Sequence, residues 1–279
     1  MIYHITTPAE WQAAQVTGVY KPKFFDQDGF IHCSDGFQIE GTANRYYKDE
    51  PELIVLEIDP EKATAEVIYE NASDGRAMRF PHLYGLLEVS AVGAVVRLER
   101  INAGKWALPP ELQRPSPTLI TEIPFNTLGK LYRTVTPGSY MFDPDDTVMQ
   151  LLKKRDVDWA VVLNETEEHE KFTGNSLLGR YALEGIQTLY AGVPDFSAPP
   201  EGNWNDHIQE TIHLLEQGKN VSVHCHAGIG RTGIFLACMA QEAFGMSPDE
   251  SIAWVRQYIP GAVETLYQVK FVRDYPKHK

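Results

Sequence analysis

Short apolar runs and amphipathic stretches alternate along the second half of the chain. The apolar runs predict strands at residues 130–135, 157–164, 186–190 and 220–223. Apolar residues at helical spacing predict a capped helix over 146–154, helical structure within 166–183 with an interruption at Gly174, and a buried helix from Gly233 onwards. Strands that alternate with helices indicate an α/β fold with a central, mostly parallel sheet.

The first half of the chain has a different pattern. Strands are predicted at residues 1–5, 53–58, 63–69 and 94–98, with a short helix at 8–14. This pattern indicates a smaller domain of α+β or mainly β type. A proline-dense polar stretch at 108–117 separates the two patterns, and 279 residues suit two domains of about 100–200 residues each. We therefore predict a first domain over 1–112, a linker over 113–118 and a second domain over 119–279.

The predicted strand at 220–223 leads into ten residues, 224–233, with the sequence His-Cys-His-Ala-Gly-Ile-Gly-Arg-Thr-Gly. A strand-to-helix loop of this kind turns successive backbone N–H groups inward, and the helix dipole adds positive charge, so the loop can hold a phosphate dianion. Gly228 and Gly230 are expected to permit the backbone angles, and the planar guanidinium of Arg231 to bind two phosphate oxygens. The residues expected to contact phosphate are His226, Ala227, Gly228, Ile229, Gly230 and Arg231.

Cys225 is expected at the floor of this positively charged loop. In such surroundings the pKa of a thiol falls from about 8.5 to roughly 3.5–7.5. The thiolate is then placed to attack phosphorus and form a phosphocysteine, which water hydrolyses. Thr232 is expected to donate a hydrogen bond to the sulfur when it becomes the leaving group. The alternative, an ordinary structural loop, is weakened by the complete string between strand and helix.

The departing alkoxide or phenoxide also needs a proton donor. The segment at 190–200 carries a single acid, Asp195, between a glycine and several prolines, thirty positions before Cys225. Asp195 is the predicted general acid, and an ordinary turn aspartate is the alternative. Asp206 and His207 lie nearby in the sequence and are expected to cap and begin a helix.

The string at 224–233 resembles the signature of the cysteine-dependent protein tyrosine and dual-specificity phosphatases, and most of all their compact dual-specificity branch. The resemblance implies the fold and chemistry of that family, an acid loop at Asp195 and a supporting role for His224. Lipid-directed relatives carry lysines where this chain has His226 and Ile229, so the resemblance disfavours polyanionic inositides as substrates.

The segment at 260–272 resembles the late loop and helix of the same family. Gln268 matches a glutamine that helps to order the hydrolytic water or braces the phosphate loop. Two positions depart from the family pattern: Glu264 stands where tyrosine-specific relatives have glutamine, and Ile259 where many compact relatives have arginine. A polar helix face for Gln268 and a helix-start charge for Glu264 are equally open alternatives.

The first half contains two polar clusters, at 29–34 and 80–85. Together with the opening residues 3–5, these clusters resemble a small bacterial family, the domain of unknown function 952. It is grouped with ADP-ribosyltransferase-like and RNA phosphotransferase-like folds, which implies a cleft for NAD or an ADP-ribose-like nucleotide. The candidate site residues are His4, His32, Ser34, His82 and Tyr84. Ordinary core or turn histidines are the alternative, and Cys33 is expected to be a buried small hydrophobe.

Composition limits the partners and the location. The net charge of −13 disfavours nucleic acid and anionic membranes. Three cysteines are too few for a disulfide framework, and a catalytic thiolate needs reducing conditions. The start of the chain lacks a signal segment, and no run reaches the roughly 18 apolar residues of a membrane span. A cytoplasmic protein is therefore predicted, and its phosphatase chemistry requires no metal or other cofactor.

These observations predict a two-domain phosphomonoester hydrolase of the protein tyrosine or dual-specificity type, acting on phosphorylated proteins. One alternative substrate is a small phosphorylated metabolite or nucleotide derivative that the fused first domain handles. An alternative of another class is a module that binds phosphate without turning it over. The complete set of Cys225, Arg231 and Asp195 argues against that alternative.

Overall fold

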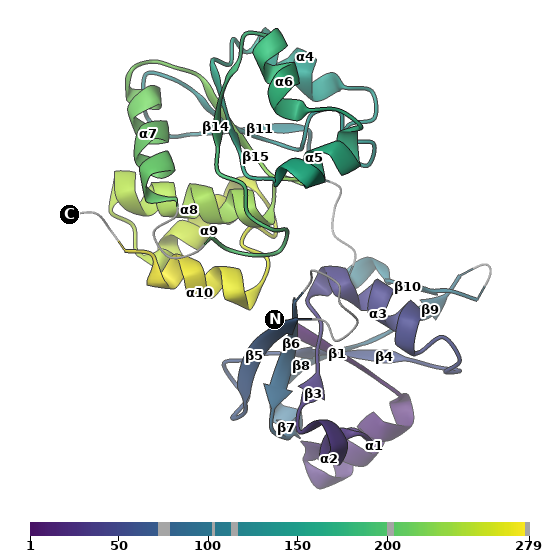
Figure 1. Cartoon of the computed structure of the whole chain (residues 1–279). Helices are drawn as coiled ribbons and strands as arrows, with labels where there is room; N and C mark the ends of the chain where they lie inside the picture. The colour runs from purple at the N-terminus through teal and green to yellow at the C-terminus, as the bar shows by residue number, and fades with distance from the viewer. Residues whose placement is uncertain (72–78, 102–103, 113–116, 200–203, 277–279) are drawn as a thin grey trace. The chain divides into compact units, whose positions relative to one another are not determined.

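A computed structural model of the chain describes residues 1–71, 79–101, 104–112, 117–199 and 204–276 (Figure 1). The contacts divide the chain into two units, Met1–Arg114 and Pro115–Lys279. The predicted linker at 113–118 lies mostly outside the described residues. In the part of the chain that is described, no helix is both long and apolar enough to cross a bilayer.

The second unit is built on a sheet with the strand order β11-β12-β15-β13-β14. Its strands are β11 (Ile120–Ile123), β12 (Leu131–Thr134), β13 (Trp159–Val162), β14 (Gln187–Tyr190) and β15 (Val221–His224). The four strands β12, β15, β13 and β14 run parallel, and β11 pairs with β12 in the antiparallel sense at the edge. The predicted mostly parallel sheet is confirmed, whereas the short edge strand β11 was not predicted.

Helices cover both faces of this sheet, as Figure 1 shows. They are α4 (Thr147–Lys154), α5 (Thr166–Thr173), α6 (Leu177–Leu183), α7 (Asn205–Glu216), α8 (Gly230–Phe244), α9 (Pro248–Tyr258) and α10 (Leu266–Asp274). Successive strand residues point to opposite faces. In β13, Val161 therefore joins a core with α7 to α10, while Ala160 and Val162 join a separate core with α4 and α6. The carboxyl ends of the parallel strands lie between these two layers.

Three predicted helix starts are corrected by the structure. α8 begins at Gly230, so the last four residues of the predicted loop form the first turn of the helix. The predicted capped helix begins at Thr147, but Asp146 makes no capping bond, and the Asp143 carboxylate accepts from the N–H of Thr147 at 2.8 Å instead. α7 begins at Asn205, which places Asp206 inside its first turn and not at the cap. A cap needs a side chain aimed at the free N–H groups, and spacing alone does not decide which nearby acid takes that direction.

The described residues of the first unit form small antiparallel sheets in the strand orders β1-β4-β8 and β3-β6-β5, and the short strand pairs β2-β7 and β9-β10. The strands are β1 (Ile2–Thr6), β2 (Val19–Tyr20), β3 (Ile31–His32), β4 (Ile54–Ile58), β5 (Glu66–Asn71), β6 (Arg79–Tyr84), β7 (Leu87–Glu88), β8 (Val92–Arg97), β9 (Glu99–Arg100) and β10 (Trp106–Ala107). The helices are α1 (Pro8–Thr17), α2 (Phe25–Asp28) and α3 (Ile39–Tyr46), with 3-10 turns at Gly36–Gln38, Val89–Ala91 and Pro110–Leu112. The α+β prediction is confirmed for this unit.

The core of the first unit lies between α3 and the sheet of β1 and β4. Ile5 and Val55 from the strands meet Ile39 and Ala43 from the helix, and Trp106 closes the cluster. Cys33 is 3% exposed, as predicted for a buried small hydrophobe, and burial raises the pKa of its thiol. This cysteine is therefore unsuited to act as a nucleophile.

Candidate active site

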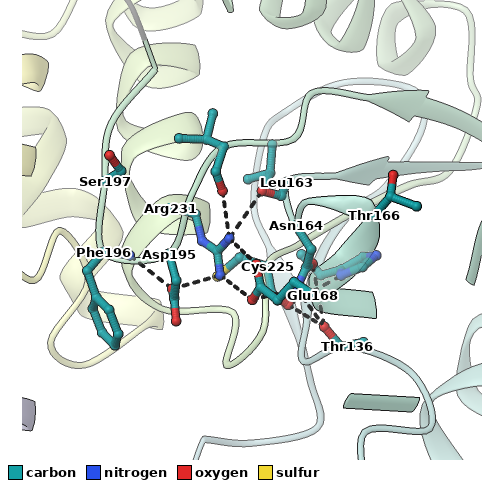
Figure 2. Close-up of polar contacts among 12 residues, drawn as sticks. Thr136, Leu163, Asn164, Thr166, Glu168, Asp195, Phe196, Ser197, Cys225 and Arg231 are labelled. Atoms are coloured by element: carbon teal, nitrogen blue, oxygen red, sulfur yellow. Dashed lines mark hydrogen bonds and ion pairs between the residues drawn. The ribbon is translucent and has the colours of Figure 1, made fainter. Parts of the chain in front are cut away.

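The loop at Cys225–Ile229 leaves the carboxyl end of the central strand β15 and runs into α8. The neighbouring parallel strands end beside it, so Thr136 after β12 and Asn164 after β13 lie next to the loop, as Figure 2 shows. Cys225 is 3% exposed and packs in the core on the α8 side of the sheet. The N-terminus of α8 carries the positive end of the helix dipole to this point, which suits an anion.

Thr136 fixes the orientation of the first peptide groups of the loop. Its hydroxyl donates to the carbonyl oxygen of Cys225 at 2.8 Å, and its N–H donates to the carbonyl oxygen of His226 at 2.9 Å. In a trans peptide the carbonyl and the following N–H point in opposite directions. The N–H groups of His226 and Ala227 therefore face away from Thr136 and are available to a bound phosphate.

The two glycines of the loop serve different purposes. Gly228 has a φ of 68°, and a Cβ there would collide with the carbonyl oxygen of Thr134. The prediction that it permits a special backbone angle is confirmed. Gly230 is outside the left-handed region, but a Cβ on it would collide with the carboxylate of Glu264. The prediction of a special angle is therefore wrong for Gly230, which instead allows the late loop to approach closely.

Replacing Gly228 with alanine is expected to destabilise the second unit by clearly more than the roughly 1–2 kcal/mol that a left-handed angle costs an ordinary residue, because the new Cβ also meets backbone. Gly174 is the matched control, since it has a φ of 69° with open space around it. Urea denaturation of the two alanine variants measures the difference. Equal losses would show that the loop shifts to accommodate the new methyl group.

Arg231 is fully buried and lies between two carboxylates (Figure 2). Nη1 and Nη2 each donate to one oxygen of Glu168 at 2.7 Å, and Nη2 also lies 2.7 Å from Oδ1 of Asp195. Nη1 donates further to the carbonyl oxygen of Val193 at 2.8 Å. Burial alone would lower the pKa of Arg231, but its anionic neighbours outweigh burial and raise it. The guanidinium is therefore charged and held in one orientation.

Glu168 is a site residue that the sequence analysis missed. It lies in α5, and Nδ2 of Asn164 donates to it at 3.1 Å. Burial would raise the pKa of its carboxyl, but the hydrogen bonds and charge of Arg231 outweigh burial and lower it. The available signal was an acidic run directly after a predicted strand, at the sheet edge where α/β folds bind ligands.

The lowered pKa of Glu168 predicts a pH-dependent contribution to stability. A depressed folded-state pKa stabilises the fold above the unfolded value of about 4.3 and loses that effect as the pH falls through the folded value. Glu168→Gln is expected to lower the free energy of unfolding at neutral pH by about 1–3 kcal/mol, with a smaller difference from wild type in acid. Urea denaturation at neutral and acidic pH checks this. Glu184→Gln, which breaks an exposed pair with Lys153, is the control, and a pH-independent deficit in Glu168→Gln would contradict the prediction.

Asp195 lies in the loop after β14, and its side chain is 38% exposed. Its Oδ1 accepts from the N–H of Phe196 at 3.0 Å, and Phe196 has a left-handed φ of 58°. Desolvation raises the pKa of this carboxyl, and the nearby Glu168 adds to the rise, which together exceed the opposing effect of Arg231. A carboxyl that keeps its proton to higher pH suits a proton donor.

Two histidines flank Cys225, and both are neutral at physiological pH. Burial lowers the pKa of His224 to about 3 and that of His226 to about 4. His224 lies 3.0 Å from the hydroxyl of Tyr181 and 3.3 Å from the carbonyl oxygen of Cys225. Nε2 of His226 lies 3.2 Å from the hydroxyl of Ser139. These contacts brace the loop without adding charge to it.

The late loop and α10 contact both the phosphate loop and the acid loop. The side-chain oxygen of Gln268 accepts from the N–H of Glu264 at 2.7 Å, and its Nε2 donates to the carbonyl oxygen of Ser197 at 3.3 Å. Ile259 is fully buried.

The hydroxyl of Thr232 is buried and has no hydrogen-bond partner among the described residues, so its donation to the Cys225 sulfur stays a prediction.

In the first unit, three of the five candidate residues gather around Glu70. Nδ1 of His82 lies 2.7 Å from a Glu70 carboxylate oxygen, and the hydroxyl of Tyr84 donates to the same oxygen at 2.7 Å. The rings of His32 and His82 lie edge to face at 5.0 Å, and Phe30 stacks on His82 at 4.1 Å. The pairing of β3 with β6 places His32 opposite His82, which explains the cluster.

The other two candidates are not side-chain members of this cluster. Both ring nitrogens of His4 are occupied, by the carbonyl oxygen of His32 at 2.7 Å and by the hydroxyl of Tyr20 at 2.8 Å. The hydroxyl of Ser34 is paired with that of Thr42 at 3.4 Å. A site formed by all five residues, and the binding of NAD or an ADP-ribose-like ligand, therefore stay predictions.

Three side chains of the second unit could together offer ligands to a metal ion. Within the described residues, Glu168, Asp195 and His226 bring potential ligand atoms within 4.8 Å of one another. Arg231 already forms ion pairs with both of these carboxylates at 2.7 Å. Its guanidinium supplies the positive charge that a metal ion would bring, so the cluster has a sufficient explanation without one.

Two family models match the chain. Residues 5–95 match the family described as "Protein of unknown function (DUF952)", and residues 140–242 match the family described as "Polymorphic toxin system, DSP-PTPase phosphatase". Both agree with the resemblances found in the sequence. The ADP-ribosyltransferase-like fold expected for the first unit has no support in these matches.

Curated relatives and solved structures agree with the second of these matches. The chain is 41% identical over 136 residues to dual specificity protein phosphatase CDC14B of Mus musculus, which is 48% of this chain and 26% of that protein. It is 40% identical over 107 residues to protein tyrosine phosphatase domain-containing protein 1 of Mus musculus, covering 38% and 14% of the two chains. The chain thus spans 14–26% of the length of these relatives. A structure of kinase associated phosphatase, with its catalytic-site cysteine replaced by serine, aligns with a TM-score of 0.51 at 21% identity over 58% of this chain and 95% of that one, which shows the fold.

Proposed function

We propose that this chain, which joins a DUF952 unit to a phosphatase domain related to the dual-specificity and protein tyrosine phosphatases, hydrolyses phosphomonoesters through a phosphocysteine intermediate. The observation that carries the proposal is the meeting of three groups at one end of the sheet. Cys225 lies at the base of the loop, Arg231 at the start of α8, and Asp195 lies 2.7 Å from Arg231 although it comes from a different loop.

The first step of the proposed reaction is attack of the Cys225 thiolate on phosphorus. An S–P bond forms, the P–O bond to the leaving group breaks, and Asp195 gives its proton to the departing oxygen. The backbone N–H groups of the loop and the guanidinium of Arg231 bind the three equatorial oxygens, where negative charge accumulates. The raised pKa of Asp195 favours the protonated form that this step requires.

The second step is hydrolysis of the phosphocysteine. Water attacks phosphorus, Asp195 accepts a proton from that water, and the S–P bond breaks to give inorganic phosphate and the thiolate. Gln268 supports this step by linking the start of α10 to the acid loop through Ser197. Glu264 lies beside Gly230 and places a carboxylate next to the phosphate loop.

Substrate binding requires a change in the partners of Arg231. Its Nη2 is engaged by Asp195 at 2.7 Å, so a phosphate oxygen has to take the place of the carboxylate there. The displaced Asp195 then becomes available to the leaving oxygen. Glu168 contacts both Nη1 and Nη2 and keeps the guanidinium plane fixed during this exchange.

The proposed substrates are phosphotyrosine and phosphoserine or phosphothreonine in proteins. The second candidate is a small phosphorylated metabolite or nucleotide derivative. Fusion to the DUF952 unit, with its cluster of His32, His82, Tyr84 and Glu70, supports this candidate, because a nucleotide-handling domain in the same chain is a source of such a phosphate. The complete set of Cys225, Arg231 and Asp195 disfavours a module that binds phosphate without turnover.

The test is release of phosphate from p-nitrophenyl phosphate by the full chain, measured over about pH 5–8. We expect turnover that orthovanadate inhibits. A panel of phosphotyrosine, phosphothreonine and nucleotide monoesters then ranks the substrate classes by kcat/KM. An absence of turnover with every member of the panel over the whole pH range would overturn the proposed function.

A further inference from the structure

Arg133 is a buried arginine of β12 that the proposed reaction leaves unused. It is 2% exposed, and its strand pairing sets it beside Val223 of β15, two residues before Cys225. Its Nη1 donates to the carbonyl oxygen of Thr118, and its Nε has no hydrogen-bond partner among the described residues. No carboxylate of the described ranges forms an ion pair with it. An isolated buried charge is strongly unfavourable, so a guanidinium in this position needs an anionic partner.

The side chain of Arg133 packs against the phosphate loop at Gly228. A Cβ placed on Gly228 would lie 3.3 Å from Cδ of Arg133, which locates the side chain against the turn of the loop. Burial lowers the pKa of Arg133 to about 10, and the negative charge of Cys225 opposes that shift. Arg133 therefore contacts the loop that carries Cys225, and its charge interacts with that of the sulfur.

Without Arg133, the carboxylates and the thiolate near Cys225 outnumber the positively charged side chains around them. Arg231 faces two carboxylates, Glu168 and Asp195, each at 2.7 Å. When Asp195 carries the proton it is to donate, Glu168 alone neutralises Arg231. Burial keeps both flanking histidines uncharged, and Glu264 beside Gly230 adds a further carboxylate. The negative charge of Cys225 also raises the pKa of Arg231, but because Arg231 is already paired with Glu168, its net contribution to stabilising a thiolate is reduced.

We propose that Arg133 is the counter-charge of the Cys225 thiolate, a positioning residue that lies against the loop and keeps the nucleophile ionised. Arg231, already neutralised by Glu168, is then left to orient and bind the phosphate. Arg133 then contributes mainly to stabilising the thiolate, whereas Arg231 contributes mainly to binding the phosphate. This inference rests on the proposed function, because it assigns a residue to the nucleophile of that reaction.

The test measures the thiolate directly and requires no turnover. Cys225 is alkylated with iodoacetamide at about pH 6, within the range where activated thiols ionise, and the rate is followed by mass spectrometry together with thiolate absorbance near 240 nm. Arg133→Met and Arg133→Gln are expected to slow alkylation about tenfold, which corresponds to a loss of about 1.4 kcal/mol of thiolate stabilisation. Arg133→Lys retains the charge and is expected to stay within about threefold of wild type.

The controls separate charge from folding and from net charge. Circular dichroism establishes that each variant is folded, and Arg133→Gln can still donate to the carbonyl of Thr118 if Arg133→Met proves unstable. Lys153→Met removes a cation from an exposed pair with Glu184 and is expected to leave alkylation unchanged. A folded Arg133→Gln protein with wild-type alkylation and absorbance would overturn the inference, as would a lysine variant no better than the glutamine one.

The result is also distinguishable from failure of the proposed function. A wild-type protein that releases no phosphate but whose Cys225 loses reactivity in Arg133→Gln would refute the phosphatase reaction and support the role of Arg133. A protein that releases phosphate normally, but whose Cys225 is alkylated equally fast with and without Arg133, would support the phosphatase reaction and refute the role of Arg133.

Discussion

Replacing Cys225 with serine is expected to lower turnover of p-nitrophenyl phosphate at least about 10⁴-fold, because the hydroxyl of serine is a far weaker nucleophile than a thiolate. The geometry of the loop should survive, since serine is close in size to cysteine and the carbonyl of residue 225 keeps its bond from Thr136. The variant should therefore still bind phosphate or vanadate. Phosphate release and ligand affinity, measured on the same preparation, check both parts.

The matched control for this substitution is a second buried cysteine of the same unit. Cys238 lies within α8, is fully buried and belongs to the hydrophobic core. Burial raises the pKa of its thiol well above the ordinary value, which makes it inert at neutral pH. Cys238→Ala should leave kcat/KM near the wild-type value even if stability falls. Substantial phosphate release by Cys225→Ser would show that another group is the nucleophile.

The second large effect is expected for Asp195→Asn, which removes the proposed proton donor while preserving the shape of the side chain. General acid catalysis contributes about 10²–10⁴-fold, so kcat should fall by that amount. The loss should be smallest for p-nitrophenyl phosphate and larger for alkyl esters, because a better leaving group needs less protonation. Affinity for phosphate should be retained or improved, because Asp195 no longer competes as an anion for Nη2 of Arg231.

The pH profile provides a separate readout of the same residue. Asp195 must be protonated to donate, and its pKa is raised, so activity should persist above the ordinary range of an aspartate and fall as the pH rises through the raised value. Asp195→Asn should lack this descending limb. Asp206→Asn, which changes a nearby acid in the first turn of α7, is the control and should keep the wild-type profile. A descending limb unchanged in Asp195→Asn would assign the proton donor to another group.

Much of the second unit could be predicted from its sequence. The parallel strands and most helices followed from apolar runs and helical spacing, and Gly174 ends α5 with a φ of 69°, where the pattern placed an interruption. The sequence-based predictions were wrong or incomplete where a contact with another part of the chain defines a strand or a helix end. The edge strand β11 is short and gains its definition from pairing with β12, and Asp143 caps α4 because of the direction in which its side chain points.

The candidate site divides in the same way. Cys225 and Arg231 were singled out from the sequence because residues in one loop keep their order and spacing whatever the rest of the chain does. Asp195 was singled out because it is the single acid of its own loop. Glu168 was missed, since its contact with Arg231 depends on how α5 follows β13 at the sheet edge. In the first unit, the register between β3 and β6 joins His32 to His82, and no local pattern indicates that register.

By itself, the sequence determined the kind of chemistry this protein carries: a cysteine and an arginine in a phosphate-binding loop, and an acid on a separate loop. Only the tertiary structure decided which charges surround that cysteine. The strand order β12-β15-β13 places Arg133 on one side of the loop and brings Glu168 from the other. The physical reason is that loop chemistry is local in sequence, whereas electrostatic balance at a buried site depends on side chains that meet only after the sheet has formed.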